Sequence, residues 1–252
     1  MTQKFDYVVL GAGKPHSGDT PTILTNVTKD QILVEWILAA FDIPLEDITF
    51  ISGYESDLVS AQYPAMNCIE NEIWGTTKTL YSLSLGLSSK TNTNAVIVSY
   101  SDIVIKKKSI DLMKECAAPI VLLVEENGSL DYTTKTVPKP FEWVATCDSQ
   151  LKKIGYNLLP CERTGRFVGC VKFSNETVNL IKQIISELDF ETIASMHLTE
   201  MIEILRCRGL ETRVIDVSGD WTEIRQDGDI ARFMLGTKAD TLLNLMPVLK
   251  SS

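Results

Sequence analysis

The sequence predicts an α/β protein in which a mostly parallel, mixed β-sheet is flanked by helices. Short apolar runs typical of buried strands alternate along the chain with segments whose apolar residues recur at helical spacing. The chain has 252 residues, 44% of them hydrophobic, and no internal repeat or flexible linker interrupts it. We therefore expect a single domain over residues 1–252 with a full hydrophobic core.

The first half of the chain gives a regular alternation of elements. Strands are expected where apolar runs end at turn residues, and helices where apolar positions follow the helical period. Asp30 would cap the first helix through its side-chain carboxylate. The expected elements are strands over 7–10, 48–52, 66–69, 95–99 and 120–124, and helices over 30–41, 56–62, 77–87 and 110–116.

The second half begins with a less regular region. Residues 126–166 are interpreted as a small β-rich insertion, with strands over 142–146 and 153–159. Regular elements then resume, and Gly209 is expected to end a helix as its C-terminal cap. These elements are strands over 167–173 and 212–217, helices over 176–188 and 198–208, and a final helical region over 227–235.

Composition argues against several classes of function. A net charge of −9 disfavours broad binding to nucleic acid or to an anionic membrane, because such binding needs a basic surface. The apolar runs are too short to span a bilayer, and the first residues lack the apolar stretch of a signal peptide, so a cytoplasmic location is expected. The six cysteines form no CxxC pair, which favours reduced thiols over a zinc site.

A glycine-rich turn directly follows the first predicted strand. Residues 10–15 read Leu-Gly-Ala-Gly-Lys-Pro, so backbone N–H groups can approach a phosphate closely and Lys14 adds a movable cation. The turn has neither the GxGxxG pattern of dinucleotide-binding proteins nor the GK[ST] ending of a P-loop. An ordinary turn before a helix is the alternative interpretation.

Two acidic residues are candidates for a Mg²⁺ site. Asp102 follows the buried strand 95–99, and a carboxylate at the carboxyl end of a central strand is well placed for Mg²⁺ and substrate phosphates. Asp102 could instead cap a turn. Glu223 would supply the second carboxylate if its segment returns to the same sheet edge. Spacing alone does not separate Glu223 from other nearby acids, namely Asp216, Asp220, Asp227 and Asp229.

Basic residues around the predicted strand 167–173 are candidates for binding an anion. Lys172 is the one charge in that apolar run, so it needs an anionic partner unless its face of the strand is wet. Arg163 and Arg166 precede the strand and could bind a substrate anion or serve as surface charge. His197 has no visible nucleophile as a partner, so a nucleophilic triad has no support.

Several short motifs, taken together and in this order, resemble one enzyme family. The resemblance is to the cytidylyltransferases associated with phosphoenolpyruvate mutase, which act in phosphonate pathways. The wider group includes phosphocholine cytidylyltransferases and sugar-1-phosphate nucleotidylyltransferases. The similar segments cover nearly the whole chain and are 8–15, 18–24, 53–54, 63–64, 71–77, 82–83, 99–103, 167–172 and 219–224.

The resemblance implies a Rossmann-like nucleotidyltransferase fold and an activity. Such an enzyme transfers CMP from CTP to a small phosphonate or phosphate monoester and releases pyrophosphate. The implied acceptors include 2-aminoethylphosphonate, phosphocholine and a phosphorylated amide, for surface-glycan or phosphonate biosynthesis. The implied partners are CTP, the small anionic acceptor and Mg²⁺, and a homodimer is an open possibility.

The resemblance also assigns roles to residues. Lys14 and Lys172 would be catalytic, with Lys14 on the triphosphate and Lys172 facing the reacting phosphate. Asp102 and Glu223 would hold Mg²⁺. The residue range 126–166 would bind the acceptor, together with Arg163, Arg166 and Lys172. The nucleotide would contact Leu10, Gly11, Ala12, Gly13, Lys14, Gly53, Thr77, Ser82 and Asp102.

The chain departs from the wider group at identifiable positions, and the departures leave room for a non-catalytic subunit, the second of two rival functions. Lys14 stands where the wider group usually has an arginine, and Arg225 follows the Glu-Ile pair where an acid is common in the phosphocholine branch. One rival is a sugar-1-phosphate nucleotidylyltransferase that uses UTP or dTTP. The other is a non-catalytic nucleotide-binding subunit of the same fold.

Overall fold

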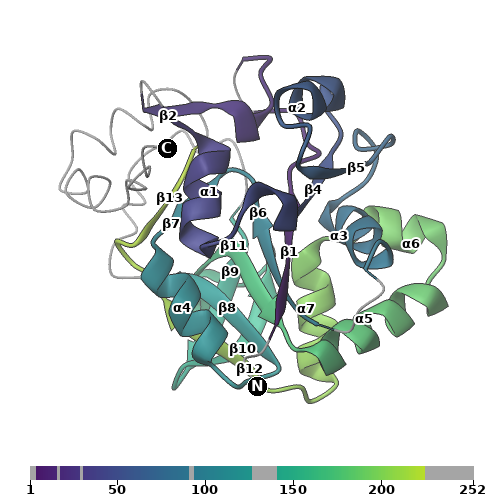
Figure 1. Ribbon diagram of the computed structural model, residues 1–252. Coiled ribbons are helices and arrows are strands. Elements are labelled where there is room, and N and C mark those ends of the chain that lie inside the picture. The colour runs from purple at the N-terminus through teal and green to yellow at the C-terminus, as the bar shows by residue number, and fades with distance from the viewer. Residues whose placement is uncertain (1–3, 16–17, 29–30, 91–93, 127–140, 225–252) are drawn as a thin grey trace.

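The computed structural model describes residues 4–15, 18–28, 31–90, 94–126 and 141–224. Within these ranges a nine-stranded sheet forms the centre of the molecule (Figure 1). Its strand order is β5 (Asn67–Glu70), β4 (Ile48–Ser52), β1 (Phe5–Leu10), β6 (Ala95–Tyr100), β11 (Gly165–Phe173), β8 (Ile120–Glu126), β12 (Thr212–Asp216), β10 (Gln150–Gly155) and β9 (Trp143–Cys147).

The sheet is mixed, as the sequence predicts. Strands β5, β4, β1 and β6 are parallel, and so are β8 and β12. The long strand β11 runs antiparallel between β6 and β8. Strand β9 pairs with β10 and also with the beginning of β11, so β11, β8, β12, β10 and β9 form a closed circuit of pairings. The described part of the predicted β-rich insertion is therefore hydrogen-bonded into the main sheet.

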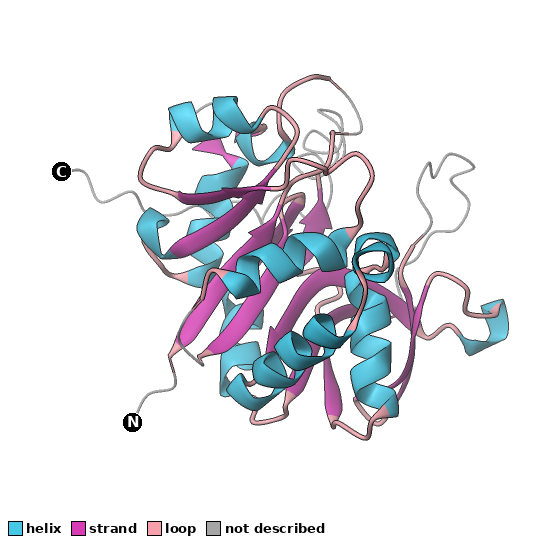
Figure 2. Ribbon diagram, turned by 90° about the vertical axis from the view of Figure 1, so that its right-hand side faces the viewer, coloured by secondary structure: helices cyan, strands magenta, loops and turns pink. Residues whose placement is uncertain are grey.

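Helices cover both faces of the sheet (Figure 2). Alternate residues of β1 point to opposite faces, so Val9 packs in one hydrophobic cluster and Val8 in the other. The cluster around Val9 contains apolar residues of α1 (Leu33–Phe41) and α4 (Lys107–Glu115). The cluster around Val8 contains those of α3 (Thr79–Ser88), α5 (Asn175–Glu187) and α7 (Leu198–Cys207).

The remaining elements are short and lie outside the main sheet. Helix α2 (Ser56–Gln62) connects β4 to β5, and α6 (Phe190–Ser195) connects α5 to α7. Strand β2 (Asn26–Thr28) pairs with β3 (Gln31–Ile32), and β7 (Ile103–Ile105) pairs with β13 (Trp221–Glu223). The second pair matters most for function, because it extends from the carboxyl end of β6.

Several element boundaries differ from the sequence prediction. The first helix begins at Leu33, because Gln31 and Ile32 pair with β2, and the N–H of Ile32 donates to Glu35 Oε2 at 3.2 Å. The expected cap Asp30 and the expected helical region 227–235 lie outside the described residues. Strand β10 covers Gln150–Gly155 instead of the predicted 153–159, because the chain turns at Tyr156 and Asn157.

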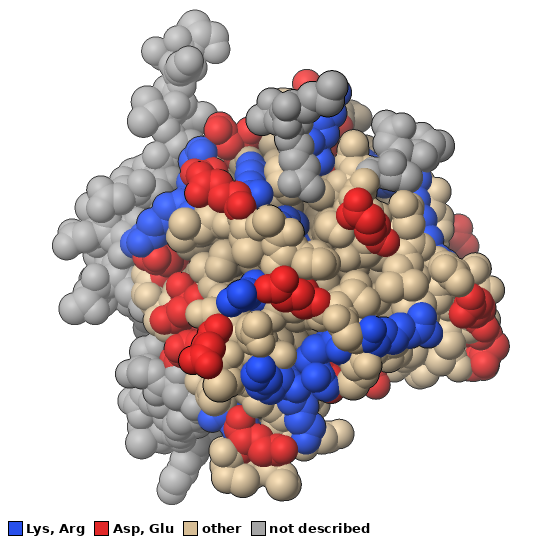
Figure 3. All heavy atoms as spheres, turned by 90° about the horizontal axis from the view of Figure 1, so that it is seen from below, with Lys and Arg blue, Asp and Glu red and all other residues tan. Residues whose placement is uncertain are grey.

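The surface carries both signs of charge. On the face shown in Figure 3, lysine and arginine side chains are interspersed with aspartate and glutamate. None of the described helices combines the length and the apolar character that a bilayer span requires. The six cysteines are free thiols, of which only Cys170 is buried, whereas Cys147, Cys161 and Cys207 are exposed.

Candidate active site

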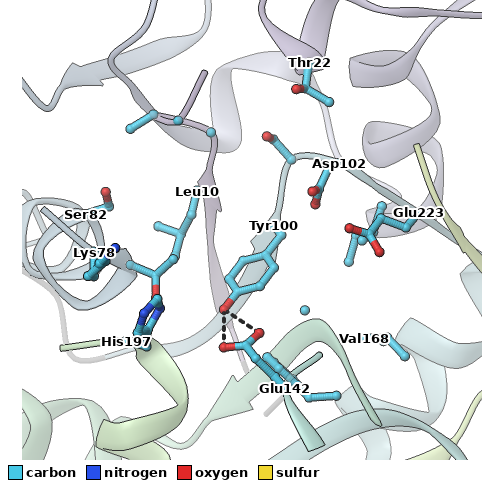
Figure 4. Close-up of a pocket in the computed structure, with 18 of the residues that line it drawn as sticks. Leu10, Thr22, Lys78, Ser82, Tyr100, Asp102, Glu142, Val168, His197 and Glu223 are labelled. Atoms are coloured by element: carbon cyan, nitrogen blue, oxygen red, sulfur yellow. Dashed lines mark hydrogen bonds between the residues drawn. The ribbon is translucent and has the colours of Figure 1, made fainter. Parts of the chain in front are cut away.

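A cavity of about 390 Å³ opens where several strands end (Figure 4). Its walls come from the turn after β1, the beginning of α3, the end of β6, the middle of β11 and strand β13. Parallel strands β1 and β6 present their carboxyl ends here, which is where α/β sheets bind ligands. Of the site residues predicted from sequence, the lining includes Leu10, Gly11, Ala12, Gly13, Lys14, Thr77, Ser82, Asp102, Arg166 and Glu223.

The glycine turn is fixed by the strands on either side of it. The N–H of Gly11 donates to Ile51 O at 2.9 Å, and the N–H of Ser101 donates to Leu10 O at 3.1 Å. A Cβ atom on Gly11 would lie 2.4 Å from the ring of Phe50, so the close approach of turn and strand requires glycine. The turn is thus held rigidly at the cavity wall.

Gly53 belongs to the support of this turn and does not line the cavity, contrary to its assignment as a nucleotide contact. A Cβ on Gly53 would lie 2.7 Å from Ala12 O, and the next N–H, that of Tyr54, donates to the same oxygen at 2.9 Å. Gly53 therefore lets the chain after β4 pack against the back of the turn.

Lys14 is a mobile cation at the cavity wall. Its Nζ lies 3.5 Å from Asp19 Oδ1, and the Lys14 side chain is 54% exposed. Nζ also lies 5.3 Å from the centre of the Tyr54 ring. An exposed ion pair contributes roughly 0–1 kcal/mol, so a substrate phosphate can displace Asp19 as the partner of Lys14.

Asp102 and Glu223 converge on one part of the cavity, although they come from distant segments. Strand β13 pairs antiparallel with β7 and places Glu223 opposite Ile103. The N–H of Ile224 donates to the carbonyl of Asp102 at 2.7 Å. Figure 4 shows the two carboxylates pointing into the same region.

This donor set fits Mg²⁺. Magnesium in phosphate-transfer sites takes one or two carboxylates and completes its shell with water and substrate oxygens. Among the described residues, no cluster of three or more His, Cys, Asp or Glu side chains could hold a metal. The Asp102–Glu223 pair thus suits an ion that arrives with substrate phosphates better than a closed structural site.

Two of the competing acids have other partners and do not line the cavity. Asp220 forms ion pairs with Lys106 at 2.7 Å and Lys108 at 2.6 Å, and these lysines hold its pKa below the usual range. Asp216 accepts hydrogen bonds from the backbone N–H of Glu126 and from Ser218. The other two competitors, Asp227 and Asp229, lie outside the described residues, as does Arg225.

Lys172 does not face the cavity, so its two predicted roles are wrong for this structure. In β11 it pairs with Ile97, in the middle of β6, whereas the cavity begins at Tyr100. The side chain is 2% exposed, and Nζ donates to the carbonyl of Cys116 at the end of α4. Burial lowers the pKa of Lys172. The buried ammonium group of Lys172 is therefore hydrogen-bonded to a backbone carbonyl, and not to the anionic partner that the sequence predicts.

Of the two arginines predicted to bind the acceptor, only one lines the cavity. Arg163 does not line the cavity. Its Nε donates to Leu158 O at 2.9 Å, and its guanidinium lies 4.4 Å from the centre of the Trp143 ring. Arg166 does line the cavity and forms an ion pair with Glu125 at 2.6 Å.

The predicted nucleotide contacts Thr77 and Ser82 are joined by hydrogen bonds through Asn71. The side-chain amide of Asn71 donates to Thr77 Oγ1 at 2.9 Å and to Ser82 Oγ at 3.2 Å. Trp74 also lines the cavity and meets Tyr54 edge to face. These polar and aromatic groups form the wall at the beginning of α3.

The opposite end of the cavity contains residues to which the sequence assigned no role in binding or catalysis. Tyr100 OH lies 3.1 and 3.2 Å from the two carboxylate oxygens of Glu142 and donates to them, and Thr199 Oγ1 donates to Glu142 Oε1 at 3.0 Å. The Tyr156 ring packs edge to face on His197. Burial and the carboxylate of Glu142 raise the pKa of Tyr100 well above its usual range and also raise that of Tyr156.

Lys78 is a further cation of the lining that sequence reasoning missed (Figure 4). It directly precedes α3, where its N–H donates to Ala194 O at 2.8 Å. Lys78 directly follows the similar segment 71–77, Tyr100 lies within the segment 99–103, and His197 directly precedes the predicted helix 198–208, so their positions were usable signals. Glu142 and Tyr156 carry no such signal, because tertiary packing brings them here.

The comparisons with known proteins identify the fold. Neither a search of protein-family models nor a search of curated proteins gives a match. The inositol-1-phosphate CTP transferase from T. maritima superimposes with a TM-score of 0.73 at 16% identity, over 100% of this chain and 99% of that one. The chain has the nucleotidyltransferase fold. The Rossmann-like fold expected from the sequence is therefore confirmed.

Two further solved structures agree with this fold. A proposed glucose-1-phosphate thymidylyltransferase from Bacillus anthracis gives a TM-score of 0.71 at 16% identity, covering 98% of both chains. The CTP:phosphocholine cytidylyltransferase from Streptococcus pneumoniae gives 0.61 at 17% identity, covering 91% of this chain and 97% of that one. None of these three is named for a phosphonate acceptor, so the phosphonate subgroup stays a prediction.

Proposed function

We propose that the chain is a Mg²⁺-dependent cytidylyltransferase that transfers CMP from CTP to a small phosphate or phosphonate and releases pyrophosphate. The observation that carries the proposal is the convergence of Asp102 and Glu223 (Figure 4), in a cavity that the glycine turn and Lys14 also line. The names of two structural neighbours support it, because one is a CTP transferase for inositol 1-phosphate and the other a CTP:phosphocholine cytidylyltransferase.

The reaction is an in-line displacement at the α-phosphorus of CTP. An oxygen of the acceptor's phosphate or phosphonate attacks, and a new P–O bond forms. The bond from the α-phosphorus to the oxygen bridging the α- and β-phosphates breaks, and its electron pair leaves with pyrophosphate. The attacking oxygen is already anionic, so no proton has to be removed. Catalysis then consists of positioning and of charge stabilisation.

The residues of the cavity divide this work. The N–H groups of the glycine turn cradle the phosphates of CTP, and Lys14 neutralises the departing pyrophosphate. Asp102 and Glu223 would hold Mg²⁺, which when bound neutralises charge on the phosphate oxygens. Arg166 binds the anion of the acceptor. Thr77, Ser82 and their partner Asn71 bind the base.

The test measures pyrophosphate release with CTP, Mg²⁺ and a panel of small phosphates and phosphonates. Asp102→Asn and Glu223→Gln should each lower turnover by about a hundredfold or more, because each removes charge from the metal site. Each should also abolish the gain in CTP affinity that Mg²⁺ gives in calorimetry. Asp220→Asn is the matched control, since Asp220 does not line the cavity. The proposal is contradicted if both variants turn over CTP at the wild-type rate.

A rival nucleotide has one supporting observation. The thymidylyltransferase neighbour matches 98% of the chain, between the 100% and 91% matched by the two CTP-using enzymes. A comparison of CTP, UTP and dTTP in the same assay separates the two functions, and a preference for dTTP or UTP with sugar 1-phosphates would favour the rival. Mg²⁺-dependent CTP binding with no turnover on any acceptor would favour a non-catalytic subunit.

A further inference from the structure

Arg166 is held in the cavity wall by a buried carboxylate. In the antiparallel pairing of β11 with β8, Arg166 lies directly opposite Glu125. Arg166 Nε donates to Glu125 Oε2 at 2.7 Å, and Nη2 lies 2.6 Å from the same oxygen. The side chain of Glu125 is 5% exposed and that of Arg166 is 18% exposed. The pair is therefore nearly buried, with only the arginine reaching the cavity.

Two aromatic rings fix the plane of the same guanidinium. Its central carbon lies 4.7 Å from the centre of the Phe141 ring and 4.7 Å from that of the Trp221 ring. Arginine stacks well on aromatic faces and keeps its donors in its own plane. A guanidinium has five N–H donors, and Glu125 engages two of its nitrogens, so donors are left for an anion.

The location of this pair matches the expected position of the acceptor. Trp221 and Glu223 are two residues apart in β13, so they point to the same side of the strand, and both line the cavity. The ring that packs on Arg166 is thus a near neighbour of the proposed metal carboxylate. An anion bound to Arg166 would lie on the same side of β13 as the carboxylate of Glu223.

We propose that Glu125 is a positioning residue, which holds Arg166 in the orientation that binds the phosphate or phosphonate of the acceptor. This inference rests on the proposed function for the identity of that anion. Glu125 also compensates the charge of Arg166 before substrate arrives, and an unpaired buried charge is costly. The carboxylate acts through the guanidinium and does not touch the substrate.

A double-mutant cycle tests this role. Phosphate binding is measured by calorimetry on the full chain saturated with the α,β-methylene analogue of CTP, for wild type, Glu125→Gln, Arg166→Gln and the double variant. Glu125→Gln should weaken phosphate binding about tenfold, and Arg166→Gln at least as much. The double variant should bind phosphate no more weakly than Arg166→Gln alone. Affinity for the CTP analogue should change less than twofold in every variant.

The control is Glu203→Gln, which breaks the Arg206–Glu203 ion pair of 2.7 Å outside the cavity and should leave phosphate affinity unchanged. Additive losses in the double variant, a parallel loss of affinity for the CTP analogue, or no phosphate binding by wild type would overturn the inference. Pyrophosphate release is scored separately. A coupled cycle in a protein that never releases pyrophosphate would support the anion site while refuting the proposed reaction.

Discussion

At the scale of single residues, two lysines with the same expected role have opposite environments. Lys14 is about half exposed on a turn, beside an acid that a substrate can replace. Lys172 is buried, and its amine is engaged by the carbonyl of Cys116. Only a lysine that can exchange partners can follow the charge of a reacting phosphate. Lys172 is therefore a structural residue and Lys14 the candidate for chemistry.

Lys14→Ala should reduce turnover without affecting the fold. Loss of this cation should lower kcat/KM for CTP by about a hundredfold, as for other groups that stabilise developing charge. The free energy of unfolding should change by less than about 0.5 kcal/mol, since the side chain is exposed and its ion pair is weak. Pyrophosphate release and urea unfolding measure the two effects. A large stability loss with normal turnover would refute the assignment.

Lys172→Met should change how stability depends on pH. Burial lowers the pKa of Lys172 below its ordinary value of 10.5, so between the lowered value and 10.5 the unfolded chain binds more protons than the folded one. Wild-type stability gains from this group as pH rises through that window, and the gain is lost as pH falls through the folded pKa. The methionine variant lacks this contribution.

The measurement is urea unfolding of both proteins from neutral pH to pH 10.5. The unfolding free energy of the variant is subtracted from that of wild type, so that the contributions of the tyrosines and cysteines present in both proteins cancel. This difference should grow with pH. A difference that stays flat or falls would contradict a lowered pKa. CTP turnover by the variant should stay close to that of wild type, because Lys172 is outside the cavity.

The sequence could identify chemistry-bearing residues only where local pattern and position agreed. Asp102 and the glycine turn follow predicted strands, and the rule that ligands bind at carboxyl ends applied to both. The predicted role of Lys172 did not agree with the structure, because an apolar run does not reveal how its strand pairs with the next one. In the register of β11 with β6, Lys172 lies opposite Ile97, which does not line the cavity. Glu125 carried no signal, since its importance depends on its cross-strand neighbour Arg166.

At the scale of elements, β11 is shaped by an irregularity next to the cavity. Its register with β8 shifts between Phe167 and Val171. Gly169, within this shift, has φ +91°, and a Cβ there would lie 2.6 Å from the Tyr100 ring. The irregular segment thus allows β11 to pass close to Tyr100, whose hydroxyl contacts Glu142.

Gly169→Ala should damage both stability and the acceptor end of the cavity. The strained backbone costs on the order of 1–3 kcal/mol, and the clash displaces Tyr100 in addition. We expect a lower unfolding free energy and a raised KM for the acceptor, with the KM for CTP nearly unchanged. Gly209→Ala is the matched control, because its φ is +88° but nothing lies within 4 Å of the added methyl group.

This control separates backbone strain from the clash. Gly209→Ala should lose roughly 1 kcal/mol of stability and keep full activity. Equal effects of the two substitutions on acceptor KM would show that the contact with Tyr100 has no functional role. Steady-state kinetics and thermal unfolding of the two variants are sufficient for the comparison.

The element pattern was predictable where elements are long enough to show a period. Strand β4 and helix α2 have the expected bounds, and α4 begins only three residues before its predicted start at Ile110. The three-residue strands β7 and β13 were not predicted, because so short a segment has no measurable alternation. These strands nevertheless place Glu223, so the least predictable elements position one of the two proposed metal ligands.

At the scale of the whole molecule, an acidic protein places both cations and acids around one cavity. The chain has a net charge of −9, and the lining includes Lys14, Lys78 and Arg166. Long-range attraction therefore contributes little to binding an anionic nucleotide, and short contacts at the carboxyl ends of the strands must supply the affinity.

The pairing of β13 with β7 has a consequence for how the protein reaches its working form. Asp102 leaves the ribosome well before Glu223, and the two meet only when the late strand docks. Until then, a nascent chain already contains the glycine turn and Lys14 but only one of the two carboxylates. Under the proposed function, a chain that ends before β13 lacks one of the two proposed metal carboxylates, and we expect it to release no pyrophosphate from CTP.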